Sequence, residues 1–144
     1  MSKPVFWLKR TYIIMRNAFD EELSDYNLST SQFEILGYLY HNEGMEQKQL
    51  QKCTGVRAAT LTGLLDKLED RGLVTREAAD YDARAKIVKM TVQGNTFFAQ
   101  LFDVMHQFED RMMAGFSPAE RSLFVDWSQR MAKNLGDSGR EGCE

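Results

Sequence analysis

Four polar residues close together in the chain have the side chains needed to read a nucleic acid, namely Arg57, Thr60, Thr62 and Lys67. They lie on the polar side of a segment whose leucines recur at helical spacing. In a major groove, a guanidinium pairs with guanine, and hydroxyl groups bond to phosphates or base edges. The same residues also suit a solvated helix face. The elements around them must decide between these two readings.

The net charge of −3 is unevenly distributed along the chain. Residues 46–89 contain nine Lys and Arg against seven Asp and Glu, whereas the remainder contains nine against fourteen. Acidic ends around a mildly basic middle would place a phosphate-facing surface in the middle. We find no glycine-rich phosphate loop and no nucleophile–His–carboxylate set, so the sequence does not indicate an enzyme. His41 and His106 are too isolated to suggest a metal site.

The apolar pattern predicts a mainly α-helical chain with one β-hairpin. Helices are expected over residues 5–26, 29–40, 47–53 and 57–71, with Ser29 and Gln32 forming a capping box and Gly55 and Gly72 acting as stops. Short strands are expected over residues 73–77 and about 85–91, with residues 78–84 as the connector. Residues 94–115 and a segment beginning at Ser117-Pro118 are again helical. A short helix, a turn, a second helix and a hairpin predict a winged helix-turn-helix.

Three motifs in register resemble the MarR family. Residues 28–36 read LSTSQFEIL, close to the family's Leu-Thr-x-x-Gln-Phe-x-x-Leu entry to its second helix. Thr60-Leu61-Thr62 and LEDRGLV at 68–74 match the recognition helix and its exit. The wing pattern appears as Arg76, Asp82-Ala83-Arg84 and MTVQG at 90–94. Glu46 departs from the family, which usually has a Thr or Ser helix cap there.

This resemblance implies a winged helix-turn-helix flanked by long dimerisation helices. Residues 1–27 would form an N-terminal dimerisation helix, 28–93 the DNA-binding lobe, 94–136 the C-terminal dimerisation helices and 137–144 a disordered tail. The implied function is a transcriptional regulator that needs no cofactor and binds a pseudo-palindromic operator as a homodimer. It would act as a repressor that a small-molecule ligand releases.

The resemblance also suggests roles for individual residues of the wing. Arg84 would enter the minor groove, whose negative potential attracts guanidinium groups. Asp82 would pair with Arg76 to hold the hairpin's shape, or would instead cap a turn locally. Lys86 and Lys89 would contact phosphates, or would only keep the wing soluble.

Apolar residues at the two ends of the chain exceed what one small domain can cover. Residues 98, 101, 105, 108 and 112 form a heptad-like seam of Phe, Leu, Met, Phe and Met. The last helix adds Leu123, Phe124, Trp127, Met131 and Leu135. Together with the broad apolar face of residues 5–19, they favour a homodimer over the alternative of a monomer core.

A small aromatic or lipophilic ligand could lie where these helices join the DNA-binding lobe. The candidate lining residues are Trp7, Arg10, Met15, Phe33 and Tyr38, which would alternatively be ordinary core. The two cysteines, Cys53 and Cys143, show no disulfide framework, which fits a reducing cytoplasm. No membrane-spanning segment or secretory signal is apparent.

The sequence is also compatible with other functions. A winged helix used only for protein–protein contact would share the fold without needing the basic recognition helix or Arg84. A thiol-based redox regulator acting through Cys53 is a further alternative, although a lone cysteine on a helix is usually inert. A structural coiled-coil dimer would not need the short helices and the wing.

Overall fold

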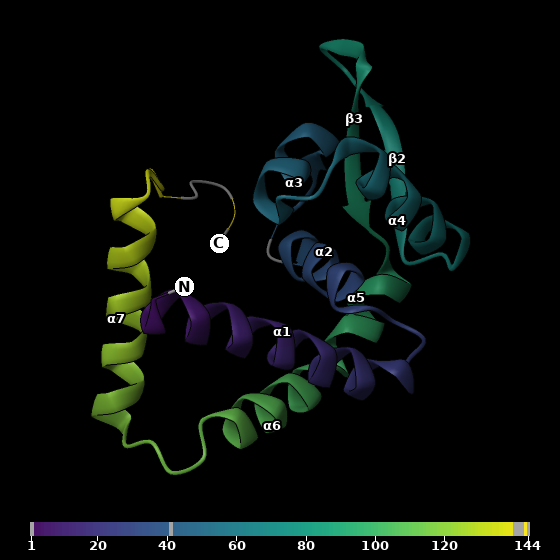
Figure 1. Cartoon of the computed structure of the whole chain (residues 1–144). Helices are drawn as coiled ribbons and strands as arrows, with labels where there is room; N and C mark the ends of the chain where they lie inside the picture. Colours follow the sequence, from purple (N-terminus) through teal and green to yellow (C-terminus); the bar gives the residue numbers. More distant parts are fainter. Residues whose placement is uncertain (1, 41, 140–142, 144) are drawn as a thin grey trace.

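The computed structural model describes residues 2–40, 42–139 and 143 (Figure 1). Their elements are, in chain order, α1 (Lys3–Ser24), α2 (Thr30–Tyr40), β1 (Met45–Glu46), α3 (Gln47–Thr54), α4 (Ala58–Asp70), β2 (Val74–Ala79), β3 (Asp82–Met90), α5 (Val92–Ala99), α6 (Phe102–Met112) and α7 (Pro118–Asn134). The strands form one antiparallel sheet in the order β1-β3-β2. The expected fold class is therefore confirmed.

Local capping signals determine where two helices begin. The Ser29 N–H donates to Gln32 Oε1 at 3.0 Å, and the Gln32 N–H donates to Ser29 Oγ at 3.1 Å. Ser117 and Glu120 form the same reciprocal pair at the start of α7, with Pro118 as the first helical residue. Each pair satisfies amide groups that have no partner within their own helix. Both predicted helix starts are confirmed.

The sheet differs from the sequence expectation in two ways. A short strand β1 pairs with β3, with Met45 opposite Val88 and Glu46 opposite Ile87. The hairpin strands are also longer than expected, because β2 and β3 extend through most of the expected connector and leave only Asp80 and Tyr81 between them. We call β2, β3 and this two-residue turn the wing. Backbone pairing needs no apolar alternation, so the added strand residues, which are Ala, Asp and Arg, gave no strand signal.

The long helix expected from residue 94 to residue 115 is divided into α5 and α6. Phe98, near the end of α5, and Leu101, within the break, are buried. The Phe98 ring contacts Phe33 at a centroid distance of 5.2 Å, and Phe108 contacts Phe19 at 4.8 Å. Much of the heptad-like seam is therefore core of this chain, and the expectation that it forms a dimer surface is wrong for these residues.

One hydrophobic core connects the end of α1 to the winged helix-turn-helix. Its centre is α2, whose buried residues include Ile35, Leu36 and Leu39. Leu50 of α3, Leu61 and Leu65 of α4 and Val88 of β3 are completely or almost completely buried in the same cluster. We call the part from α2 to β3 the winged lobe.

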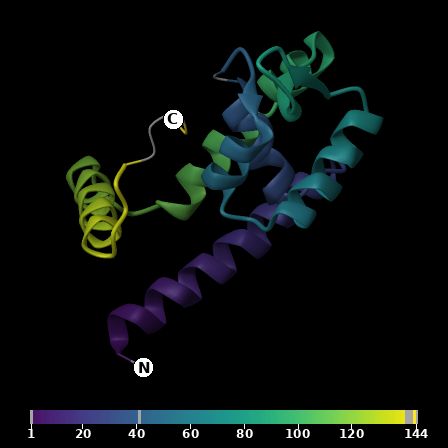
Figure 2. The same ribbon diagram turned by 90° about the horizontal axis from the view of Figure 1, so that it is seen from above.

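The N-terminal half of α1 and the whole of α7 extend away from the winged lobe. Figure 2 shows α1 projecting as a single straight helix, while α7 lies on the side of the molecule away from the winged lobe. Within residues 2–40, 42–139 and 143, no helix has the length and apolar character needed to cross a bilayer. The same residues contain no cluster of three or more His, Cys, Asp or Glu side chains able to hold a metal ion.

Candidate nucleic-acid interface

Helices α3 and α4 and the turn between them form the helix-turn-helix. Helix α3 ends at Gly55, which has the left-handed conformation (φ 72°, ψ 6°) that glycine adopts without strain. Helix α4 then starts after Arg57, whose side chain makes no capping bond. Gln47 Nε2 donates to Thr62 Oγ1 at 3.3 Å, so the start of α3 contacts α4 directly. The turn and this contact set the position of α4 relative to α3.

The outer face of α4 combines small residues with polar ones. Leu61, Leu65 and Leu68 face the core, and at about 100° per residue Ala59 and Gly63 lie opposite them. Apart from its chain neighbours and the backbone of its own helix, no atom lies within 4 Å of the position that a Cβ on Gly63 would take. The four predicted contact residues, Arg57, Thr60, Thr62 and Lys67, are all exposed around this face. Because the side chains at these outermost positions are so small, α4 can closely approach the floor of a DNA groove.

The hydroxyl of Thr62 is partly used within the protein. It donates to Ala58 O at 3.1 Å and accepts from Gln47. A hydroxyl has one donor hydrogen and two acceptor lone pairs, so Thr62 retains acceptor capacity only. Among the predicted α4 contacts, Arg57, Thr60 and Lys67 are therefore better placed to donate to phosphates or to the acceptors on guanine.

Arg76 of β2 clamps the wing to α4. Its Nη2 bonds to Asp66 Oδ1 and, at 3.0 Å, to Glu69 Oε1, and its backbone N–H donates to Glu69 Oε2 at 3.2 Å. The hydrogen bonds from Arg76 hold the pKa of Glu69 below its usual 4.5. The predicted Arg76–Asp82 pair is wrong, because the antiparallel register places Arg76 opposite Val88, well away from the turn.

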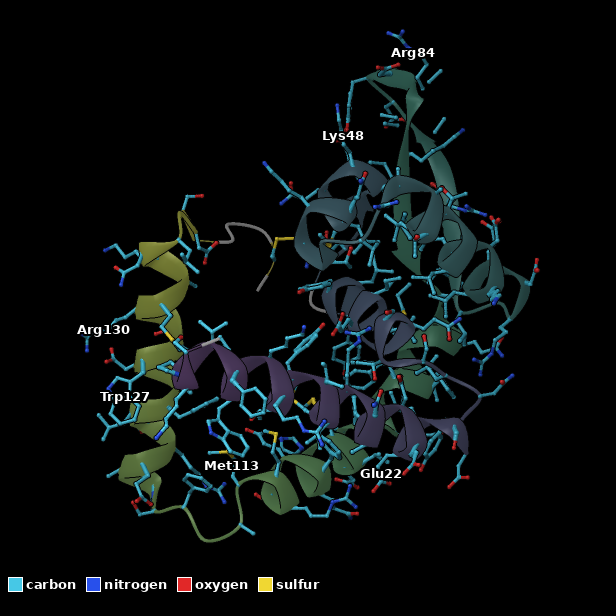
Figure 3. The ribbon with its side chains drawn as sticks, in the orientation of Figure 1. Glu22, Lys48, Arg84, Met113, Trp127 and Arg130 are labelled. Atoms are coloured by element: carbon cyan, nitrogen blue, oxygen red, sulfur yellow. A yellow bond between two sulfur atoms is a disulfide. The ribbon has the colours of Figure 1, made fainter. Side chains whose placement is uncertain are left out.

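Asp82 instead organises the tip of the wing. Its Oδ1 accepts the backbone N–H of Arg84 at 2.9 Å and the Arg84 Nε at 3.4 Å. This is the local turn cap that the sequence left open as the alternative. The Arg84 side chain is 94% exposed at the outer end of the wing (Figure 3). It can leave Asp82 for another anion at little cost, since exposed ion pairs contribute little stability.

The remaining wing lysines differ in their surroundings. Lys89 Nζ lies 3.6 Å from Glu77 Oε2, across the β2–β3 ladder, so its charge is partly offset. Lys86 is exposed opposite Ala78. Of the two, Lys86 is better placed for a phosphate contact.

Sequence reasoning missed two lysines of α3. Lys48 and Lys52 are exposed one helical turn apart and line a hollow of about 480 Å³ with Glu46, Gln51 and Val56. Lys48 lies at the same end of the winged lobe as Arg84 (Figure 3). In helix-turn-helix proteins the first helix crosses the phosphate backbone. The i, i+4 spacing of these lysines on that helix was the signal that could have identified them.

The five candidate pocket residues do not gather at one place. Met15 lines a mainly apolar hollow of about 310 Å³ between α1 and α6, with Thr11, Ile14, Ala18, Phe108, Arg111 and Met112. Phe33 is buried in the core, and the Tyr38 hydroxyl donates to Cys53 O at 3.3 Å. Trp7 is 62% exposed, with its ring against Phe6, and Arg10 is exposed.

The two cysteines are joined in a disulfide, with a Cα–Cα distance of 5.4 Å. The expectation that they form no disulfide is therefore wrong. They are separated by 90 residues, and no local spacing rule could pair them. The predicted disordered tail at 137–144 falls partly on residues outside the described ones. Of the rest, the Asp137 N–H donates to Ala132 O at 3.0 Å and Cys143 is held by the disulfide.

Comparison with known proteins identifies the family of this chain. The sequence profile of the MarR family matches residues 26–85. Over 110 residues the chain is 33% identical to the uncharacterized HTH-type transcriptional regulator YdgJ of Bacillus subtilis (strain 168), covering 76% of this chain and 67% of YdgJ. This chain belongs to the MarR family. It is a transcriptional regulator of the winged helix-turn-helix type, and such regulators are not enzymes.

Solved structures show the same fold over most of the chain. The structure of Bordetella bronchiseptica BpsR, whose DNA binding is regulated by 6-hydroxynicotinic acid, is similar with a TM-score of 0.83 and 24% identity, over 91% of this chain and 99% of BpsR. The S. aureus MepR–DNA complex is similar with a TM-score of 0.83 and 20% identity, over 93% and 99% of the two chains. This MarR-family chain therefore has the fold of these regulators over more than 90% of its length.

Proposed function

We propose that this MarR-family regulator binds a pseudo-palindromic operator in double-stranded DNA as a homodimer. Helix α4 would enter a major groove, and Arg84 would enter the adjacent minor groove. The observation that carries the proposal is the exposed set on α4 together with a 94% exposed arginine at the wing tip. Lys48, Lys52 and Lys86 would add phosphate contacts, which give affinity without sequence preference.

The apolar surfaces outside the winged lobe support a dimer. On α1, seven large apolar residues are exposed, from Val5 to Ile14, and on α7 they include Leu123, Phe124, Val125, Trp127 and Met131. Trp127 is 52% exposed and projects from α7 away from the winged lobe (Figure 3). Apolar surface of this extent on a monomer typically marks an interface. A two-fold dimer would present its two α4 helices to half-sites about 10 base pairs apart.

The hollow between α1 and α6 supports a ligand that releases the DNA. It is lined mostly by apolar side chains, and Arg111 lies at its edge with its guanidinium over the Phe108 ring at 5.3 Å. Arg111 also pairs with Glu22 at 2.8 Å. An aromatic or lipophilic anion could compete for Arg111 while burying its apolar part. Regulation of BpsR by 6-hydroxynicotinic acid gives a precedent within the same fold.

Ligand binding would act through the position of the winged lobes. The hollow lies between α1 and α6. A ligand bound there could have a higher affinity for a dimer whose two winged lobes are wrongly spaced for the operator. It would then weaken operator binding by favouring that dimer. The protein would then be a cytoplasmic repressor that the ligand releases, with no cofactor required.

Operator binding measured by fluorescence anisotropy tests the proposal. The operator is obtained by unbiased selection from random DNA, and wild type is compared with Arg84→Ala at near-physiological salt. We expect Arg84→Ala to cost about 1–3 kcal/mol of operator affinity with an unchanged circular dichroism spectrum. The matched control is Arg130→Ala, which removes another exposed arginine on α7, far from the wing, and should bind like wild type.

Two outcomes would contradict parts of the proposal. Equal affinity of wild type and Arg84→Ala would show that the wing does not reach the minor groove. A folded dimer that selects no DNA at all would instead favour a winged helix used for protein–protein contact.

A further inference from the structure

We propose that Arg71 is a positioning residue that fixes the angle of α4 relative to α1, and with it the half-site spacing that the dimer reads. The inference rests on the proposed function above. Arg71 lies where α4 ends, and its backbone N–H donates to Lys67 O at 3.2 Å. Its side chain reaches the turn between α1 and α2, 44 residues earlier in the chain. The end of α4 and this turn both lie on the side of the molecule opposite α7 (Figure 1).

The guanidinium of Arg71 binds two successive backbone carbonyls of that turn. Nη1 donates to Asn27 O at 2.7 Å, and Nη2 donates to Tyr26 O at 3.1 Å. The guanidinium also lies over the Phe97 ring of α5, 5.2 Å from the ring centroid. A planar fork that makes two bonds at once fixes orientation as well as distance. Arg71 therefore joins the end of α4 to the α1–α2 turn and to α5 at one point.

The turn that Arg71 binds continues directly from the end of α1. The Tyr26 N–H donates to Leu23 O at 2.9 Å, and the Asn27 N–H donates to Ser24 O at 3.0 Å. Asn27 has a φ of 52°, a left-handed conformation that asparagine tolerates better than most residues. This conformation sets the direction of the Asn27 carbonyl, which accepts the shorter of the two Arg71 bonds. The two carbonyls are therefore fixed relative to α1.

On the other side of this joint, α4 and the wing form one unit, because Arg76 clamps β2 to α4. A tilt of α4 about its Arg71 end would carry the wing and Arg84 with it. Because α4 has 13 residues and is about 20 Å long, a tilt of about 10° would move its other end by about 3.5 Å, roughly the rise of one base pair. Arg57 and Thr60 lie at that moving end. A small change of angle at Arg71 therefore changes which bases they can reach.

Helix α1 connects the joint to the surface proposed to form the dimer. It is one continuous helix from Lys3 to Ser24, and its exposed apolar residues from Val5 to Ile14 belong to that surface. In a two-fold dimer, a change of angle in one subunit is repeated in the other. Apolar packing is non-directional, so the leucines of α4 favour burial without fixing its angle closely. The fork of Arg71 cannot turn without lengthening one of its bonds, so it supplies the direction that the packing lacks.

Operators with altered half-site spacing test the inference. Wild type and Arg71→Lys are measured by fluorescence anisotropy on the selected operator, on the same half-sites one base pair closer or farther apart, and on random DNA. Lysine keeps the positive charge but has no fork, so it cannot hold both carbonyls in the same geometry. We expect Arg71→Lys to bind the selected operator about 10-fold more weakly, as for the loss of one hydrogen bond from a charged donor. It should bind the other three DNAs within about 2-fold of wild type, because phosphate contacts do not depend on the spacing.

Two sets of variants provide the controls. Arg130→Lys makes the same substitution in an arginine that pairs with Asp126 within α7, and it should keep the wild-type preference for spacing. Asn27→Gly retains the left-handed conformation and should also behave like wild type, whereas Asn27→Ala strains it and should reproduce the loss of preference. Asn27→Ala combined with Arg71→Lys should lose little more, because both substitutions disturb the same joint. If Arg71→Lys does not fold, the two Asn27 variants decide the question.

Thermal melting of the same variants separates positioning from stability. A lower Tm of Arg71→Lys with an unchanged preference for spacing would overturn the inference, because Arg71 would then only stabilise the fold. An equal loss of affinity on all four DNAs, or a wild-type preference in Asn27→Ala, would also overturn it. If wild type selects no DNA, the proposed function fails and the inference fails with it. If wild type prefers one spacing and Arg71→Lys prefers it equally, the inference alone fails.

Discussion

Gly94 fills a position where the backbone approaches too closely for any side chain, and Gly94→Ala should strongly destabilise the protein. A Cβ at this position would lie 2.1 Å from Leu73 O and 2.8 Å from Met90 Sδ. The methionine can move, but the carbonyl accepts the Thr91 N–H at 3.0 Å and is part of the exit from α4. The backbone would have to move by roughly 1 Å to relieve this clash, because overpacked sites are accommodated through backbone shifts.

The cost of this substitution can be estimated from the bonds that the movement would strain. Thr91 is the N-cap of α5, and its Oγ1 accepts the Gly94 N–H at 2.9 Å and donates to Gly72 O at 2.6 Å. Overpacking of a core costs about 1–3 kcal/mol, and losing a cap costs about 1 kcal/mol. We expect Gly94→Ala to lower the free energy of unfolding by about 2–4 kcal/mol. For a chain of this length, that corresponds to a fall in Tm of roughly 6–12 °C.

The matched control is Gly63→Ala, a helical glycine with open space around it. Alanine there should raise stability by about 0.5–1 kcal/mol, because it reduces the conformational freedom of the unfolded chain. Both variants and wild type are melted by circular dichroism at one protein concentration and one redox state, because dimerisation and the disulfide also affect Tm. A Gly94→Ala protein as stable as wild type would refute the close-approach argument.

Three further predictions concern the wing and its neighbours. Arg76→Ala should lower stability by about 1–2 kcal/mol and also weaken operator binding, because it releases the wing from Asp66 and Glu69; unchanged stability and affinity would contradict the clamp. Because the pKa of Glu69 is lowered by Arg76, its stabilising contribution is present above pH 4.5 and is lost as the pH falls through the lowered pKa. The Tm difference between wild type and Glu69→Gln should therefore shrink below pH 4.5, and a pH-independent difference would argue against an ionic role. Lys48→Ala should weaken binding to all DNA sequences alike and reduce the slope of log affinity against log salt by about one; a change in sequence preference instead would mean that Lys48 contacts bases.

Sequence alone determined where several helices begin or end, because the signals that mark these ends act within one helical turn. The Ser29–Gln32 and Ser117–Glu120 boxes join residues three positions apart, and Gly55 stops α3 through its own backbone conformation. The leucines of α4 identify its buried face, which in turn places Arg57, Thr60, Thr62 and Lys67 on its exposed face. The three MarR-like motifs, at their spacing along the chain, added the predictions of the wing and of the family.

Tertiary structure alone decided which distant residues meet. Arg76 had several carboxylates within reach along the chain, and only the strand register and the packing of β2 on α4 select Asp66 and Glu69 over Asp82. Phe98 and Phe108 are apolar at a spacing that suits either a dimer seam or a core, and only the break between α5 and α6 turns them onto Phe33 and Phe19. The Cys53–Cys143 pair spans 90 residues and depends on the path of the chain after α7. Contacts of this kind leave no periodic trace in the sequence, because their partners are brought together only when the whole chain has folded.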